Sequence, residues 1–80
     1  MISKLKTESK VVGIKQSRKA VTAGKAVCVF LAADADPHVT DPLEELCAQY
    51  QVPVERGVSM KELGCACGIS VGAAVAALVR

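Results

Sequence analysis

Apolar runs along this chain alternate with segments of helical character. β-Branched and apolar residues concentrate in four predicted strands, at residues 11–13, 26–32, 52–58 and 73–79. The run AVCVFLA, residues 26–32, has no polar position, which is typical of a strand buried on both faces. Helices are predicted before and between the strands, at residues 2–10, 15–23, 42–50 and 59–68. This alternation predicts one α/β domain over residues 1–80, with helices on both faces of a sheet of about four strands.

The ends of the predicted helices carry residues that favour helix boundaries. Gly24 ends the helix before it, because glycine adopts the left-handed conformation without strain. Asp41 caps the following helix, and Pro42 takes its first position. Ser59 and Glu62 match a capping box at the start of the last helix. An apolar stripe on the middle helix is predicted to lie in the core, and its members are Leu43, Leu46, Cys47 and Tyr50.

The composition limits what the core and the chain can do. Apolar residues make up 51% of the 80 residues, but the chain has one Tyr, one Phe and no Trp, so the core is built from short aliphatic side chains. A chain of this length has room for one core and not for a deep active site built from several parts. The longest apolar run, residues 71–79, is far shorter than the ~20 residues that cross a bilayer, so no membrane segment is expected.

The four cysteines have the sequence context of small hydrophobic residues. Cys28 lies within the apolar run, and Cys47 lies on the predicted helix stripe. Cys65 and Cys67 are separated by one residue, whereas zinc sites use about two to four. We therefore expect no metal and, since the sequence shows no signal peptide, a reducing, cytoplasmic location.

Positive charge is concentrated in the first third of the chain. Residues 1–25 hold seven Lys or Arg against one acid, a net charge of +6, whereas residues 26–80 hold three against seven, a net charge of −4. One strongly basic end on a chain of net charge +2 favours an anionic partner at one place. The alternative is a lysine-rich terminus that is only solvated.

Residues that could carry catalysis or bind a nucleotide cofactor are sparse. The one histidine, His38, lies in the turn-like segment DPHVT, and the sequence places no nucleophile beside it. Asp34 and Asp36 follow the buried strand, where acids are typical of a solvated cap or turn rather than a paired-carboxylate site. Gly13 begins neither a G-x-G-x-x-G nor a P-loop pattern. The sequence thus predicts no enzyme activity and no cofactor.

The segment GIKQSRKAV, at a strand-to-helix junction, is the strongest candidate for a binding site. A helix that begins after Gly13 presents free N–H groups and the positive end of its dipole. Lys15, Gln16 and Lys19 fall on one side of that helix. Lysine and glutamine side chains can meet base edges while neighbouring charges hold phosphates. Because the chain has so few aromatic residues for base stacking, the predicted partner is a structured RNA recognised through base edges and shape.

A second candidate segment, GISVG, places apolar residues in a predicted loop. Ile69 and Val71 flank Ser70 between two glycines, which is an unusual choice for a turn that faces only water. Two interpretations stay open at this point. Either the two apolar side chains fold back onto the core, or residues 69–71 form a contact surface for an unstacked base.

Three segments follow one another with a spacing that spans nearly the whole chain, GIKQSRKAV, LAADADP and SMKELGCACGISVGAAVA. Together they resemble the kink-turn RNA-binding family that includes the ribosomal proteins L7Ae and L30e, and most closely its small bacterial members. The resemblance implies a three-layer α-β-α sandwich with a mixed sheet. It also implies binding to a kink-turn, an RNA duplex sharply bent at a short bulge beside tandem sheared G·A pairs.

Through this resemblance, Gly13, Lys15, Gln16 and Lys19 correspond to the family residues that contact the G·A pairs in the major groove. Archaeal and eukaryotic members usually have Asn and Glu where this chain has Lys15 and Gln16. An amide in place of a carboxylate, together with an added positive charge, implies looser recognition of base edges and stronger attraction to phosphates.

Other segments take their roles from the same resemblance. Asp36, the acid before a proline, corresponds to a position near the pocket for an extruded base. Ile69, Ser70 and Val71 correspond to a loop that covers the bulge nucleotides. Lysine is frequent in the family where this chain has Met60, and Lys61 next to it is expected to supply that charge.

The implied function is stabilisation of the kinked form of an RNA that exchanges between kinked and open forms. The target would be ribosomal RNA, a riboswitch or another kinked RNA, bound by a monomer with or without stable association with the ribosome. The alternative hypothesis is a ribosome-associated protein-interaction module that touches RNA only loosely.

Overall fold

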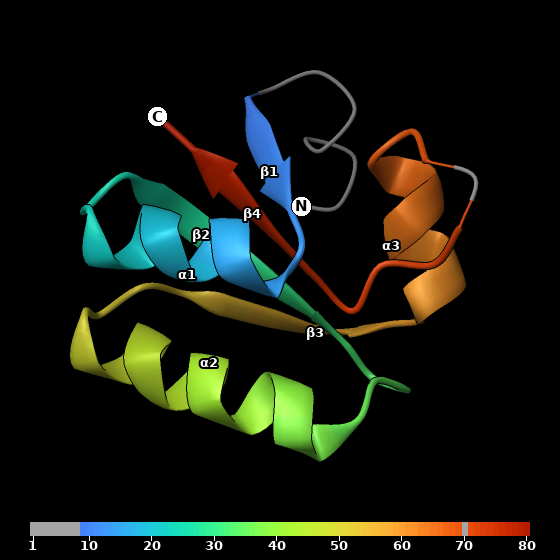
Figure 1. The fold of residues 1–80 in the computed structure, drawn as a ribbon, viewed down its shortest axis with the longest axis horizontal. Coiled ribbons are helices and arrows are strands. Elements are labelled where there is room, and N and C mark those ends of the chain that lie inside the picture. Colours follow the sequence, from blue (N-terminus) through green and yellow to red (C-terminus); the bar gives the residue numbers. More distant parts are fainter. Residues whose placement is uncertain (1–8, 70) are drawn as a thin grey trace.

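Strands and helices alternate through the part of the chain that the structure, a computed structural model, describes, which is residues 9–69 and 71–80. The elements are β1 (Lys10–Val12), α1 (Ile14–Thr22), β2 (Ala26–Ala32), α2 (Pro37–Gln49), β3 (Val54–Val58), α3 (Met60–Ala66) and β4 (Val75–Val79), as Figure 1 shows. The helix predicted at residues 2–10 lies outside the described residues, apart from its last two positions. Lys10, the last of these, begins β1 instead.

The strands form one mixed sheet in the order β1-β4-β2-β3. β4 pairs antiparallel with both β1 and β2, whereas β3 pairs parallel with β2. β1, β2 and β3 therefore run in one direction, and β4 runs in the opposite direction. The predicted mixed, four-stranded α/β sheet is confirmed.

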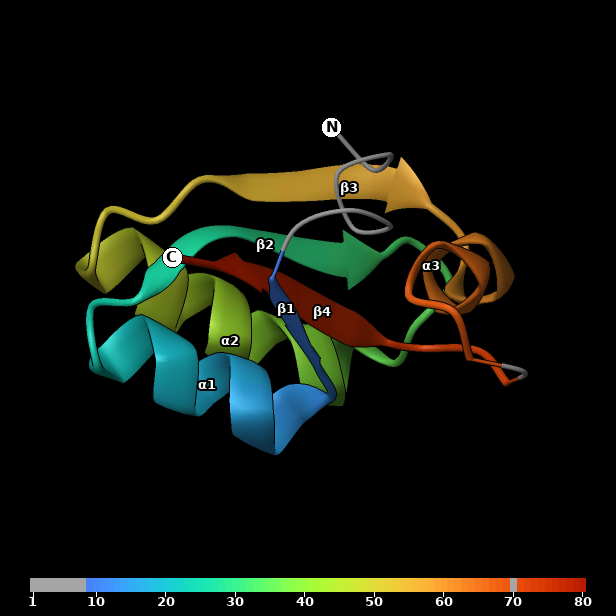
Figure 2. The same ribbon diagram turned by 90° about the horizontal axis from the view of Figure 1, so that it is seen from above.

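Helices cover both faces of this sheet. Figure 2 shows α1 and α2 together on one face, while α3 lies near one end of the sheet. The core on the α1 and α2 face includes Val21, Val29, Leu31, Leu43, Cys47 and Val75. The core on the opposite face joins α3 to the sheet and includes Cys28, Phe30, Leu63, Ala76 and Leu78. The fold is thus the predicted three-layer α-β-α arrangement.

β2 alternates its side chains between these two cores. Cys28 and Phe30 face α3, whereas Val29 and Leu31 face α1 and α2. Burial on both faces confirms the prediction drawn from the uninterrupted apolar run, with one exception. Val27 is 45% exposed because the register between β2 and β4 shifts at this residue, so its side chain does not follow the alternation between the two cores.

α2 begins five residues earlier than predicted. Its N-cap is Asp36, whose carboxylate accepts a 2.9 Å hydrogen bond from the His38 N–H, and Pro37 takes the first helical position. The sequence predicted Asp41 as the N-cap and Pro42 as the first helical residue, which are a second acid-proline pair further along the chain. Pro42 lies inside the helix instead, where it has no N–H to donate to the His38 carbonyl in the helical pattern.

The apolar stripe predicted on α2 is correct for its first members and wrong for the last. Leu43 and Cys47 are buried and Leu46 is half-buried, but Tyr50 is 47% exposed. Tyr50 is the C-cap residue, at which the backbone leaves the helix, so its side chain leaves the stripe.

Each helix ends with the same pair of backbone hydrogen bonds, known as the Schellman motif. In α1, the Gly24 N–H bonds the Val21 carbonyl and the Lys25 N–H bonds the Ala20 carbonyl. Gly24 and Gly68 occupy the left-handed position after α1 and α3, which confirms the predicted role of Gly24. At the end of α2 the same position is held by Gln51, at φ 57°.

Among the described residues, no helix is long and apolar enough to cross a membrane.

The predicted capping box at the start of α3 is present, with hydrogen bonds of 3.0 and 3.1 Å between Ser59 and Glu62. The predicted bounds of β2 are exact, and those of β1, α1, β3, α3 and β4 are shifted by one or two residues at one or both ends.

Substituting Gln51→Gly should raise the free energy of unfolding by about 0.5–1 kcal/mol. A left-handed conformation costs a residue with a Cβ about 1–2 kcal/mol, and the larger backbone entropy of glycine in the unfolded chain offsets part of the gain. Urea unfolding measures the change. Gln49→Gly in the last turn of α2 is the control, and it should lower stability by up to about 1 kcal/mol. An unchanged or lower stability of the Gln51 variant would contradict the assignment.

Candidate nucleic-acid interface

One end of the sheet gathers the segments that the sequence singled out. β1, β2 and β3 end there and β4 begins there, because β4 runs opposite to the other three strands. The segments at this end are Gly13, the turn at residues 33–36, the start of α3 and the loop at residues 68–74. Figure 2 shows the connections into α3 and β4 converging at this end.

Gly13 joins β1 to the start of β4 and begins α1. Its φ is 100°, a value that side chains rarely tolerate, and its N–H donates to the Val75 carbonyl at 2.9 Å. An added Cβ would meet no atom within 4 Å, so conformation, not crowding within the described chain, requires glycine here. The open space above Gly13 leaves room for a partner to approach the backbone closely.

The first turn of α1 has no side-chain cap among the described residues. Gly13 provides no side-chain cap and the turn contains no acid. Lys15, Gln16 and Lys19 are all exposed, while Ser17 and Val21 on the opposite side of the helix are buried. The structure therefore brings three predicted contact residues and Gly13 together, as the sequence predicted for this helix.

Charge is separated between α1 and α2. α1 carries Lys15, Arg18 and Lys19 and has no acid. The exposed side of α2 carries Asp41 and Glu45 and has no Lys or Arg. Among the described residues, Arg56 forms an ion pair with Glu44 and the His38 ring lies beside Asp36, and no cation of α1 is paired with an acid.

Asp36 lies at the same end of the sheet, but its carboxylate is engaged by its own helix. One oxygen accepts the His38 N–H and lies 3.1 Å from His38 Nδ1, and the side chain is 63% exposed. Its predicted place near an extruded base stays a prediction.

Asp34 has a structural role that the sequence did not indicate. Its Oδ1 accepts the Met60 N–H at 2.7 Å, which ties the turn after β2 to the start of α3. The Met60 carbonyl accepts the Ala73 N–H at 3.0 Å, which adds the segment before β4. Lys61, exposed on the next position of α3, is held near this junction.

The predicted apolar loop is exposed. Ile69 is 37% exposed and Val71 is 69% exposed, so the alternative in which both fold back onto the core is wrong. Ser70, between them, lies outside the described residues. Exposed aliphatic side chains at this end of the sheet leave contact with a partner as the remaining hypothesis.

Gly64 positions this loop and was missed by the sequence interpretation. The residue is buried within α3, and a Cβ added to it would lie 2.1 Å from the Val71 carbonyl oxygen. The Gly64 carbonyl also accepts the Ile69 N–H at 3.0 Å. Glycine inside a predicted helix is unfavourable unless another segment packs closely against it, and that was the available indication.

Three of the four cysteines pack in the interior of the protein. Cys28, Cys47 and Cys67 are buried and Cys65 is exposed. Burial raises the pKa of the Cys47 thiol, and the nearby Cys28 raises it further. Burial also raises the pKa of the Cys67 thiol, with Lys10 acting in the opposite direction. Both thiols therefore stay protonated near pH 7 and are poor nucleophiles or metal ligands.

Comparison with known proteins identifies one family. The family described as "Ribosomal protein L7Ae/L30e/S12e/Gadd45 family" matches residues 2–80. An RNA-binding protein of Geobacillus sp. (strain WCH70) is 49% identical over 70 residues, which cover 88% of this chain and 85% of that protein. An RNA-binding protein of Caldanaerobacter subterraneus subsp. tengcongensis is 46% identical over 68 residues, which cover 85% of this chain and 83% of that protein.

Solved structures show the same fold. The Giardia lamblia 15.5kD RNA binding protein superposes with a TM-score of 0.89 and 32% sequence identity, over 99% of this chain and 68% of that one. The three-layer architecture described above is therefore shared along essentially the whole length of the chain.

Substituting Gly64→Ala should displace the loop at residues 69–71. The new methyl group would overlap the Val71 carbonyl, so we expect a loss of about 1–3 kcal/mol in stability in spite of the better helix propensity of alanine. Amide NMR shifts of Ile69 and Val71, together with urea unfolding, test this. Cys65→Ala, at the adjacent exposed position, is the control and should leave both unchanged. A Gly64 variant with unshifted loop amides would show that the close contact is not required.

Proposed function

The chain belongs to the ribosomal protein L7Ae/L30e/S12e/Gadd45 family, and from this premise we propose that it is an RNA-binding protein that recognises kink-turns and stabilises their bent form. The observation that carries the proposal is that the basic start of α1 and the exposed apolar residues Ile69 and Val71 lie at the same end of the sheet. Relatives named as RNA-binding proteins support it. Family membership also confirms the resemblance drawn from the three sequence segments.

The start of α1 is proposed to contact the tandem G·A pairs. The open backbone at Gly13 and the uncapped first turn offer N–H groups with the positive end of the helix dipole. Gln16 can donate and accept at a base edge, whereas Lys15 and Lys19 can donate to bases or hold phosphates. Together these groups fit the major-groove face of a purine-rich step.

The loop at residues 69–71 is proposed to cover the bulge. Ile69 and Val71 offer aliphatic surface, on which an unpaired base can be sheltered from water without an aromatic partner. The contact between Gly64 and the Val71 carbonyl holds the loop against α3, so this surface is formed before RNA arrives. Lys61 would add a phosphate contact next to it.

The mechanism is a shift of population. An RNA that exchanges between open and kinked forms is biased only by a difference in affinity for the two forms. The G·A pairs and the bulge nucleotides are aligned for simultaneous contact in the kinked form alone, so only that form binds α1 and the loop at the same time. Kink-turns in ribosomal RNA or in riboswitches, encountered in the cytoplasm, are the targets we propose.

Substituting Lys19→Ala should weaken binding to a kink-turn RNA by about tenfold or more, because a base or phosphate contact at the centre of the interface is lost. Fluorescence anisotropy with a labelled kink-turn measures the dissociation constant. Lys4→Ala removes the same charge from the chain terminus. It should mainly reduce the salt dependence of binding, by a slope of about 0.7–0.9.

The decisive control is an RNA in which the G·A pairs are replaced by Watson–Crick pairs. Wild-type protein should bind it at least about tenfold more weakly than the kink-turn. Equal affinity for the two RNAs would overturn the proposal and favour loose, non-selective contact with RNA.

A further inference from the structure

A groove of about 400 Å³ lies between α1 and the strands β1 and β4. Its apolar lining is made of small residues, Val11, Ala20, Ala23 and Val79. Its polar lining is Gln16, Lys19, Lys25 and Arg80. We call this surface the basic groove. Two of its residues, Gln16 and Lys19, already belong to the proposed kink-turn interface.

The other two cations are held at the far end of α1. Lys25 follows the left-handed Gly24, and its N–H bonds the Ala20 carbonyl at 3.0 Å. Its own carbonyl accepts the Arg80 N–H at 3.0 Å, which fixes the end of β4 beside the turn after α1. Figures 1 and 2 both show the C-terminus next to this turn. The two positive charges are therefore placed together by backbone hydrogen bonds.

The basic groove carries three cationic side chains, and no described residue of its lining has an acidic side chain. α1, β1 and β4 contain no acid either. The ion pairs found among residues 9–69 and 71–80 do not involve Lys19, Lys25 or Arg80. A hollow lined by one sign of charge raises the local concentration of an anionic partner.

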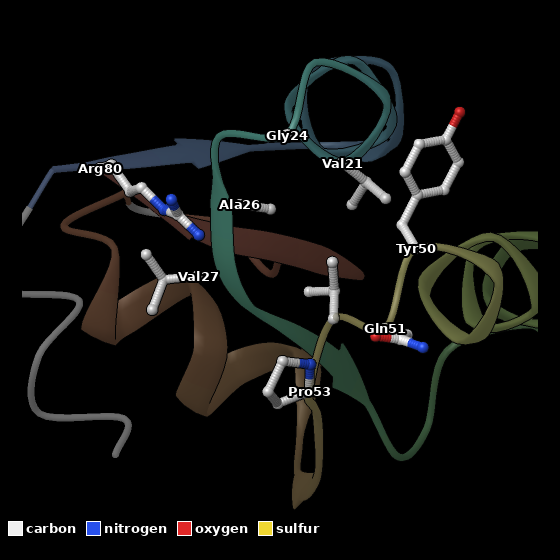
Figure 3. Close-up of a pocket in the computed structure, with 9 residues that line it drawn as sticks. Val21, Gly24, Ala26, Val27, Tyr50, Gln51, Pro53 and Arg80 are labelled. Atoms are coloured by element: carbon white, nitrogen blue, oxygen red, sulfur yellow. The ribbon is translucent and has the colours of Figure 1, made fainter.

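The positive surface stops at Arg80. Arg80 also lines a second pocket, of about 290 Å³. Figure 3 shows Arg80 and Tyr50 at opposite sides of this second pocket. The remaining lining residues are uncharged: Val21, Gly24, Ala26, Val27, Tyr50, Gln51, Val52 and Pro53. An anion is thus favoured from Lys19 as far as Lys25 and Arg80, and not beyond.

We propose that the basic groove binds the phosphate backbone of the RNA stem that continues from the G·A pairs. This inference rests on the proposed function, because it takes the start of α1 as the place where those pairs are bound. α1 has nine residues and is about 13 Å long, which is enough for cations at its two ends to meet different phosphates of one strand. Lys19 meets the backbone nearest to the kink, and Lys25 and Arg80 meet it further along the stem.

The lining favours a nucleic acid backbone over a peptide. Its apolar residues are small and none is aromatic, so it offers no deep anchor of the kind that dominates protein interfaces. Lysine ammonium groups and an arginine guanidinium, in contrast, are the groups that bind phosphate oxygens, the latter in a bidentate way. Shallow walls of Ala and Val let a sugar-phosphate backbone approach the cations.

The test uses two kink-turn RNAs that differ only beyond the G·A pairs. In one the stem is closed by a loop directly after these pairs, and in the other it continues for one helical turn. On the long RNA, Lys25→Ala and Arg80→Ala should each weaken binding about three- to fivefold and reduce the salt slope by about 0.7–0.9. On the short RNA, both variants should bind like the wild type.

Arg56→Ala is the matched control, because it removes one exposed positive charge from β3, at the other edge of the sheet. It should leave both RNAs within about twofold of the wild type. Equal losses on the short and long RNAs, or a loss for Arg56→Ala as large as for Arg80→Ala, would overturn the inference. Failure of the proposed function is distinct, because the wild type would then not prefer the kink-turn over its Watson–Crick counterpart.

Discussion

Burial of β2 and β4 between two helical layers is the constraint that the rest of the structure follows. Val29, Val75 and Ala77 face one layer, while Phe30 and Ala76 face the other, so the middle of the sheet has no side open to solvent. Polar chemistry is therefore confined to the ends of the strands and the outer sides of the helices. The small side chains of both cores let thin helices pack closely on the sheet, which keeps the strand ends near one another.

Hydrogen bonds between distant segments hold one strand end as a unit. The Gly13 N–H bonds the Val75 carbonyl, and Asp34 bonds the Met60 N–H. The turn after β2, the start of α1, the start of α3 and the loop before β4 thereby share a single framework. The backbone positions from which the side chains of this end project are therefore fixed relative to one another, which lowers the entropic cost of binding.

Features set by neighbours in the sequence could be predicted, and features set by distant contacts could not. The buried strand β2 and the capping box at Ser59 follow from local composition and spacing, and both are present. Two acid-proline pairs, Asp36–Pro37 and Asp41–Pro42, could each begin α2. That the helix begins at the first pair depends on the path of the chain after β2. Gly64 depends on a loop carbonyl that reaches it only in the folded state. The sequence could not establish which individual side chains contact a partner, because these contacts depend on a molecule that is not part of the chain.

The separation of charge between α1 and α2 has a consequence for how the protein meets a polyanion. Lys15 and Lys19 lie on one helix and Asp41 and Glu45 on the other, so the molecule carries an electric dipole moment directed across its helical face. The field of a polyanion exerts a torque on such a dipole, which turns α1 toward the polyanion during diffusion, before any contact forms. Orientation of this kind increases the share of collisions that are productive. It also makes the association rate constant, in addition to the affinity, fall as ionic strength rises.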